Sequence, residues 1–313
     1  MNDLALRIGS TLAVAGGLAS FSWLRFGLGP ALGVFVVALG VGLLAGLAPV
    51  LRRARVARAP FPVRYRAVLE RDVHVYRALA PTERARFEQN VAIFLGEQSV
   101  TGPRGEVLDD ELRVLVAASA VIVVFGRPGF HYPTTRDVIV YDDAFDESYE
   151  VGGRKNFLGM VHGSGPILLS GRALRQGFID PRDGHNVGLH EFAHVLDFDA
   201  GQADGIPSFM PWRAVKPWLR VMHDETKRIR RHHSILRDYA ATNDAEFFAV
   251  ATEMFFEQPQ RMREKHAALY ALLRTTYGQD PAHVRPIVTP TAASPSPDAS
   301  STVESIARSD VER

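Results

Sequence analysis

The chain has 313 residues, of which 46% are hydrophobic and 23% charged, and its formal net charge is only +1. A chain of this length can bury one sizeable core, divided between at most two domains. The near balance of charge argues against a nucleic-acid polyanion as the partner. Because the chain has no cysteine, disulfides and cysteine-ligated metals are excluded, which leaves histidine and carboxylate side chains as metal ligands.

The first sixty residues differ from the rest of the chain. Residues 8–24 carry no charge, and after Arg25 a second uncharged run extends over residues 26–51. As a helix the second run is about 39 Å long, enough to cross a bilayer, whereas the first run is at the lower limit of length. The sequence therefore predicts a membrane anchor over residues 1–58, with one or two transmembrane helices. A signal peptide and a buried hairpin are the competing interpretations.

Arginines gather on one side of the second run. Arg52, Arg53, Arg55 and Arg58 follow it, while only Arg25 separates the two runs. Because positively charged flanks tend to stay in the cytoplasm, we expect the rest of the chain to face the cytoplasm.

Hydrophobic periodicity predicts a globular domain over residues 59–285. The expected helices, in chain order, span residues 81–95, a stretch that opens at 109–110, and residues 189–198, 217–232, 245–256 and 261–277. The short strand candidates are residues 121–125, 138–141 and 167–169. A few strands followed by several helices indicate an α+β domain, mainly helical with a small sheet. Residues 286–313 are rich in proline and serine without an apolar period, and we expect them to form a disordered tail.

His190 and His194 stand four residues apart in the segment His-Glu-Phe-Ala-His. On a helix this spacing places both imidazoles on one face, a turn apart, where they can bind one ion. Glu191, one residue after the first histidine, is the natural general base for a water that zinc has made acidic. The sequence therefore predicts a catalytic Zn²⁺ site.

A catalytic zinc needs a third protein ligand, and the candidates lie downstream of the histidines. Asn243 is a plausible N-cap, which puts Glu246 in the first turn of a helix. Spacing alone leaves two interpretations open: Glu246 is a ligand, or it closes the helix end in a capping box. Glu253, two turns further on nearly the same face, is either the fallback ligand or a partner that orients a ligand histidine.

The segments 188–197 and 239–256 together resemble the Mlc titration factor A family of bacterial zinc peptidases, and the similarity extends from about residue 64 to residue 281. More distantly, they are similar to the catalytic domain of anthrax lethal factor. The resemblance implies a zincin-like metallopeptidase fold, with His190, His194 and Glu246 as zinc ligands and Glu191 as general base. It also implies that Tyr239 stabilises the oxyanion of the reaction, a role for which a phenol O–H is suited.

Taken together, the motif, the anchor and the resemblance imply a zinc metallopeptidase at the cytoplasmic face of a bacterial inner membrane, with peptides or proteins as substrates. Members of the family sequester a transcriptional repressor of sugar uptake. The alternative is therefore a membrane-tethered protein that binds a Mlc-like repressor, with proteolysis secondary.

A short segment ahead of the motif is a candidate for substrate binding. Gly165, Pro166, Ile167 and Leu168 are expected to form an edge strand along which an extended peptide pairs, with a plain core strand as the alternative. His162 and His185 flank the motif without ligand spacing, and we expect them to be structural or solvent-exposed.

Overall fold

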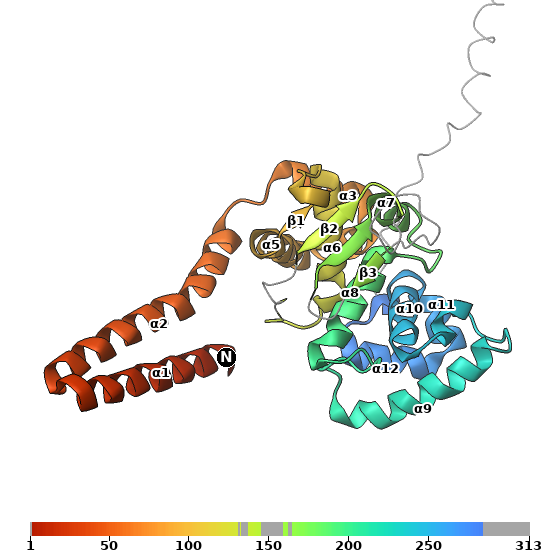
Figure 1. The fold of residues 1–313 in the computed structure, drawn as a ribbon. Helices are drawn as coiled ribbons and strands as arrows, with labels where there is room; N and C mark the ends of the chain where they lie inside the picture. The colour runs from red at the N-terminus through yellow and green to blue at the C-terminus, as the bar shows by residue number, and fades with distance from the viewer. Residues whose placement is uncertain (1, 131, 133–136, 145–158, 162–164, 284–313) are drawn as a thin grey trace, which may run out of the picture.

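The computed structural model describes residues 2–130, 132, 137–144, 159–161 and 165–283. Two long helices precede a domain in which helices surround a small sheet (Figure 1). The helices are α1 (Asn2–Phe26), α2 (Leu28–Arg58), α3 (Val63–Asp72), α4 (His74–Ala78), α5 (Pro81–Glu97), α6 (Asp110–Val124), α7 (Gly171–Ile179), α8 (Val187–Asp197), α9 (Trp212–Ile229), α10 (Asp244–Glu257), α11 (Pro259–Lys265) and α12 (Ala267–Tyr277). The strands are β1 (Val100–Thr101), β2 (Val138–Tyr141), β3 (Gly159–Val161) and β4 (Ile167–Ser170).

Helices α1 and α2 form a hairpin that projects from the domain (Figure 1). The chain reverses at Gly27, whose φ of 88° favours glycine. Among the described helices, α2 is the one that is long and apolar enough to cross a membrane by length and composition. At its far end α2 lies against α5, where Arg52 donates to the Gly96 carbonyl and Arg53 forms an ion pair with Glu97.

The sheet has the strand order β1-β2-β4-β3, with β3 antiparallel to β4 and the other pairs parallel. Ile167 and Leu168 pair with β2 on one side and β3 on the other. The prediction of an edge strand here is therefore wrong, because the backbone groups of β4 already bond to two neighbours and Gly165 and Pro166 precede the strand. Among the described strands, β3 lies at this edge of the sheet.

Residues 121–125, predicted as a strand, belong instead to helix α6 and its C-terminal cap. Asp109 caps the N-terminus, accepting a hydrogen bond from the Leu112 N–H at 2.7 Å. The helix is buried on all sides between α3, α5, α7 and α8. Such a helix shows no amphipathic period, so its run of valines and isoleucine looks like a strand in the sequence.

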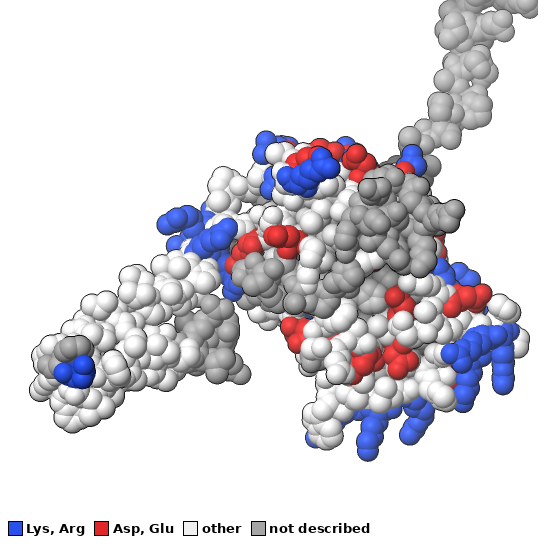
Figure 2. Space-filling view, viewed as in Figure 1, with Lys and Arg blue, Asp and Glu red and all other residues white. Residues whose placement is uncertain are grey.

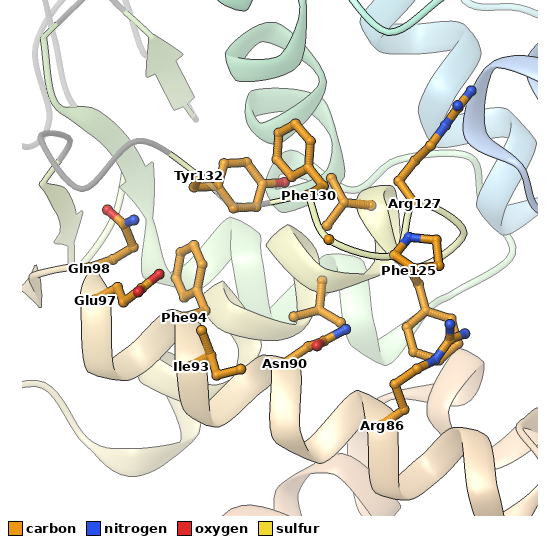
Figure 3. A pocket seen from close by; sticks show the side chains of 14 residues that line it. Arg86, Asn90, Ile93, Phe94, Glu97, Gln98, Phe125, Arg127, Phe130 and Tyr132 are labelled. Carbon is orange, nitrogen blue, oxygen red and sulfur yellow. The ribbon is translucent and has the colours of Figure 1, made fainter. Parts of the chain in front are cut away.

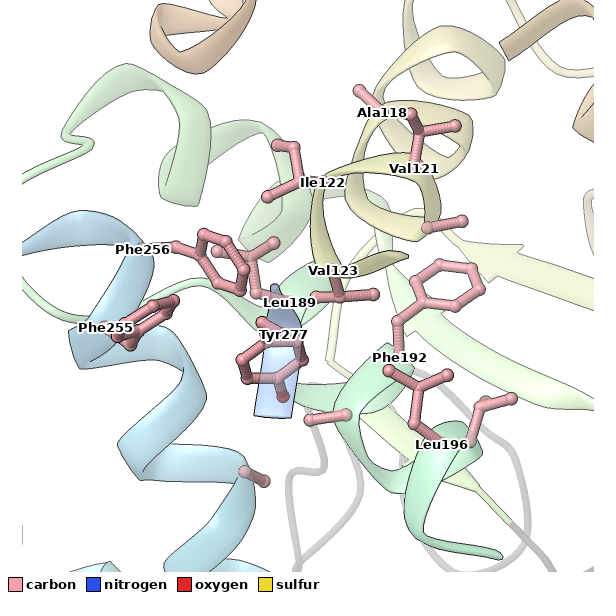
Figure 4. Close-up of a cluster of buried hydrophobic side chains, with 14 of the residues drawn as sticks. Ala118, Val121, Ile122, Val123, Leu189, Phe192, Leu196, Phe255, Phe256 and Tyr277 are labelled. Atoms are coloured by element: carbon pink, nitrogen blue, oxygen red, sulfur yellow. The ribbon is translucent and has the colours of Figure 1, made fainter. Parts of the chain in front are cut away.

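The core forms where α6, α8, α10 and α12 meet (Figure 4). Leu189 of α8 is drawn beside Val123 of α6 and Tyr277 at the end of α12, whereas Phe192 of α8 packs against Phe94 and Tyr132. The Tyr277 hydroxyl forms a hydrogen bond of 2.6 Å with Thr252 of α10. The helix that carries the histidine motif is therefore held by the most buried part of the molecule.

The predicted helix over residues 261–277 is two helices, α11 and α12, broken at His266. The break has φ −137° and ψ 55°, which are outside the helical region. There the buried His266 ring is 3.0 Å from the Glu225 carboxylate of α9. The helix is thus interrupted at a tertiary contact, although the apolar pattern of the sequence continues through this position. The predicted tail, residues 286–313, lies outside the described residues.

Candidate metal centre

Helix α8 places the histidine motif in the core. Asn186 caps it, accepting a hydrogen bond from the Leu189 N–H at 3.1 Å. Gly188 allows a close approach to α6, because a Cβ at this position would lie 2.1 Å from the Ser119 hydroxyl. His190 and His194 are only 9% and 8% exposed, and both project from the same face.

Helix α10 brings the third candidate ligand to this face. The Asn243 side chain accepts a hydrogen bond from the Glu246 N–H at 2.9 Å, so Asn243 is an N-cap as predicted. The Glu246 carboxylate turns toward the two histidines. Of the two interpretations that spacing left open, the capping box is not formed: the Asn243 side chain caps the backbone N–H of Glu246, while the Glu246 carboxylate faces the histidines and does not reach back to the helix end.

Three atoms converge in this cluster. The His190 and His194 Nε2 atoms are 3.2 Å apart, and Glu246 Oε2 is 3.1 Å from the first and 3.4 Å from the second. Ligand atoms about 2.0–2.1 Å from a tetrahedral zinc are separated by about 3.3 Å, so the three distances match the edges of such a site. Glu246 Oε2 is also buried without a partner in hydrogen-bond geometry. The residues therefore fit a divalent metal ion.

The electrostatics of the cluster favour positive charge. Burial lowers the pKa of the His190 imidazole, but the carboxylates of Glu253 and Glu246 outweigh burial and raise that pKa to about 10. Burial likewise raises the pKa of Glu246, yet the close contacts of its carboxylate with the His190 and His194 imidazoles, and the charge of these rings, hold that pKa well below its usual range. A cation at this position, whether a proton or a metal ion, is stabilised by these carboxylates.

Glu253 takes the second of its two predicted roles and orients a histidine. Its Oε1 atom lies 2.7 Å from His190 Nδ1, and its Oε2 accepts a hydrogen bond from the Asn186 N–H at 2.6 Å. Arg237 forms an ion pair with the same carboxylate. Because Nδ1 is engaged by Glu253, Nε2 of His190 is free to point at the cluster.

Glu191 lies beside the cluster with its carboxylate almost fully buried, at 4% residue exposure. Burial raises its pKa to about 7, against the opposing charges of His190 and His194. Its Oε2 has no hydrogen-bond partner among the described residues. Gly159 of β3 makes room for it, since a Cβ there would lie 2.2 Å from Glu191 Oε1.

Tyr239 stands at the open side of the cluster. Its residue is 50% exposed, and its ring centroid is 6.0 Å from that of His190. Burial of the phenol and, after it, the negative charge of Glu246 together raise the pKa of Tyr239 to about 12. At neutral pH the hydroxyl is therefore protonated and can donate a hydrogen bond.

Among the described residues, the histidines outside the motif take no part in the cluster. His185 is exposed, as predicted, and contacts Arg237. His162 lies outside the described residues. Sequence reasoning missed Arg237 and Gly159, because a lone arginine and a lone glycine carry no spacing signal that links them to a motif elsewhere in the chain.

A separate cavity of about 170 Å³ lies between α5 and residues 125–132 (Figure 3). Its walls include Phe94 and Tyr132, whose rings also contact Phe192 of α8 at 5.7 and 5.5 Å. None of the cluster residues lines it.

Known bacterial proteins are similar to this chain over most of its length. A protein of Synechocystis, slr2042, is 29% identical over 244 residues, covering 74% of this chain and 89% of that protein. Mlc titration factor A of Edwardsiella ictaluri is 32% identical over 225 residues, which are 62% of this chain and 81% of the relative. The Salmonella typhi protein of the same name is 31% identical over 228 residues, covering 65% and 82%.

The family described as glucose-regulated metallo-peptidase M90 matches residues 49–278, which include α8, α10 and every residue of the cluster. This match spans most of the chain and coincides with the part of the molecule that carries the candidate ligands. The chain therefore belongs to the M90 metallopeptidase family.

Proposed function

We propose that the chain is a zinc-dependent peptidase that hydrolyses peptide bonds. The observation that carries the proposal is the convergence of His190, His194 and Glu246 beside the buried Glu191 carboxylate. Two imidazoles and one carboxylate form a donor set typical of catalytic zinc, which keeps one position for water or substrate.

In this proposal each side chain has one task. A bound zinc ion would make water acidic and polarise the substrate carbonyl. Glu191 accepts the proton of the attacking water and passes it to the departing amine. Tyr239 donates its O–H to the oxygen on which negative charge develops. Glu253, supported by Arg237, keeps the His190 ring in the required tautomer.

The substrate in this proposal pairs with β3, not with β4 as the sequence suggested. Strand β3 is hydrogen-bonded to β4 on one side, and Gly159 within it contacts Glu191. A peptide added along such an edge gains main-chain hydrogen bonds, as extended peptides do on other sheets. It would then present its carbonyl groups close to the general base.

The α1–α2 hairpin supports a proposal for where the protein is located in the cell. Residues 1–58 anchor the protein in a bacterial inner membrane, and the catalytic domain, residues 59–285, lies in the cytoplasm. The arginines at the end of α2 support this orientation.

The Glu191→Gln protein tests the chemistry. It keeps the shape of the side chain but removes the base, so we expect kcat for a peptide to fall about 10²- to 10⁴-fold while metal content stays near one ion per chain. Metal analysis and a peptide-library assay on both proteins are the measurements. Full activity of Glu191→Gln would contradict the proposal.

Relatives named Mlc titration factor A favour a second candidate, the binding of a Mlc-like repressor. A tethered protein that bound a repressor would hold it at the bilayer and away from DNA. Pull-down with the Glu191→Gln protein separates the two functions: a stable repressor complex supports titration, and its absence leaves the peptidase alone.

A further inference from the structure

Positive charge concentrates on one helix of a chain whose net charge is nearly zero. Residues 212–233 hold seven arginines and lysines but only two acidic residues, Asp224 and Glu225. Glu225 is buried and engaged by His266, and Asp224 is 3.9 Å from Lys227. Seven cations against two carboxylates leave this segment with a positive surplus of five, and Figure 2 shows a row of blue side chains along this part of the molecule.

Several of the basic residues are spaced so that they form one row along the helix surface. Intervals of three and four residues place side chains on one helical face. The row, here called the cationic stripe, consists of the cations Arg213, Lys216, Arg220, Lys227 and Arg230, with the polar His223 between Arg220 and Lys227. It lies opposite the buried face of α9, which carries Ala214, Trp218 and Met222. At about 1.5 Å per residue the stripe is about 25 Å long.

A groove runs along part of the stripe. Leu219, Met222 and Thr226 lie in it, with the stripe residues His223, Lys227 and Arg230 and the carboxylate of Asp244. Its volume is about 380 Å³. Trp212 and Leu219, which are 78% and 41% exposed, flank the stripe. Cationic groups beside exposed apolar ones can bind a chain that carries both acidic and apolar side chains.

The groove is connected to the segments that carry Tyr239 and Glu246. Arg230 contacts the Ala241 carbonyl, in the turn that begins at Asp238 and contains Tyr239. Asp244 lies in the first turn of α10, two residues before Glu246. The turn at Asp238–Ala241 and the first turn of α10 therefore join the stripe to the candidate ligand Glu246.

We propose that the cationic stripe binds an acidic segment of a polypeptide, in extended form, beside the metal centre. This inference rests on the proposed function, since it describes the substrate or partner of that site. At about 3.3 Å per residue, the stripe accommodates about seven or eight residues. A lipid surface fits less well, because α9 lies on the side of the domain away from the junction of α2 and α5 (Figure 1).

Fluorescence anisotropy with the full chain in detergent micelles tests the proposal. The probes are a labelled peptide of about eight residues with glutamate at alternate positions, and the same peptide with glutamine in their place. We expect the glutamate peptide to bind at least about tenfold more tightly, and the difference to shrink between about 0.05 and 0.3 M salt. The Arg220→Glu, Lys227→Glu double variant should abolish that difference.

The matched control is the Arg228→Glu, Arg261→Glu double variant, which changes the net charge equally at two exposed positions outside the stripe. It should retain the preference, and thermal unfolding should show that both variants are folded. Equal loss in the two variants would overturn the proposal. So would tighter, stripe-dependent binding of anionic vesicles or of an oligonucleotide. The assay measures binding and not cleavage, so it separates the two proposals. Binding of the glutamate peptide without its hydrolysis would contradict the proposed peptidase activity but would still support peptide binding by the stripe.

Discussion

The unit formed by α8 and α10 and the hairpin formed by α1 and α2 are built on opposite principles. In the first, buried polar side chains are joined to one another: Glu253 holds both His190 and the Asn186 N–H. In the second, large apolar side chains are exposed, with Leu24 at 85%, and the described contacts to the domain gather at the end of α2. The unit of α8 and α10 is held by polar contacts within the protein, whereas the surface of the α1–α2 hairpin suits the apolar interior of a bilayer.

This comparison predicts where mutations act. In α8 and α10 a change of a single atom should alter metal binding or catalysis. In the hairpin even a large deletion should leave the chemistry intact.

The largest effect is expected from Glu246→Gln. The amide replaces a carboxylate that lies within 3.4 Å of both histidine nitrogens, so one charged ligand is lost. We expect the affinity for zinc to fall by about a hundredfold or more, measured by competition with a chelator. Asp244→Asn, an exposed change in the same helical turn, is the control. Unchanged zinc affinity in Glu246→Gln would remove this residue from the ligand set.

A smaller effect is expected from Gly159→Ala. The new Cβ would lie 2.2 Å from Glu191 Oε1, and the carboxylate must move to accept it. Because the ligands are not touched, kcat should fall about tenfold at unchanged zinc content, a cost typical of overpacking. Gly46→Ala in α2, where a Cβ meets nothing within 4 Å, is the matched control. Loss of zinc in Gly159→Ala would mean that the change disturbs the whole cluster.

The smallest effect on catalysis is expected from deletion of residues 1–58. The hairpin supplies no residue to the cluster, so the remaining chain should cleave a soluble peptide with kcat within about twofold of the full chain. The deleted protein should move from the membrane fraction to the soluble fraction of cells. Retention in the membrane fraction would show that another surface of the domain binds the bilayer.

The two regions also differ in what the sequence could predict. The histidine spacing is local, so the helix and the common face of His190 and His194 could be predicted from the five adjacent residues 190–194. That Glu253 orients a histidine was one of two alternatives that the sequence predicted. Glu253 is seven residues after Glu246, and this interval returns to nearly the same face of a helix. Length and composition were enough to predict the apolar helix α2.

What the sequence could not supply was pairing between distant segments. Strand order is not encoded in the apolar run 167–170, so β4 was expected at an edge although β3 covers it. The contact between Gly159 and Glu191 depends on that order. The continuation of helix α6 through residues 121–124 and the break at His266 were missed for the same reason: tertiary contacts override local propensity.

The carboxylates at the far end of α10 have a consequence for how the protein takes up metal. Glu253 and Glu257 accept hydrogen bonds from the backbone N–H groups of Asn186 and His185, and so fasten α10 to the start of α8 without any ion. The candidate ligands on α8 and α10 are therefore already positioned before a metal ion binds. Metal uptake then resembles docking into a rigid receptor, with little loss of chain entropy. The gain in thermal stability should grow only with the logarithm of the free metal concentration.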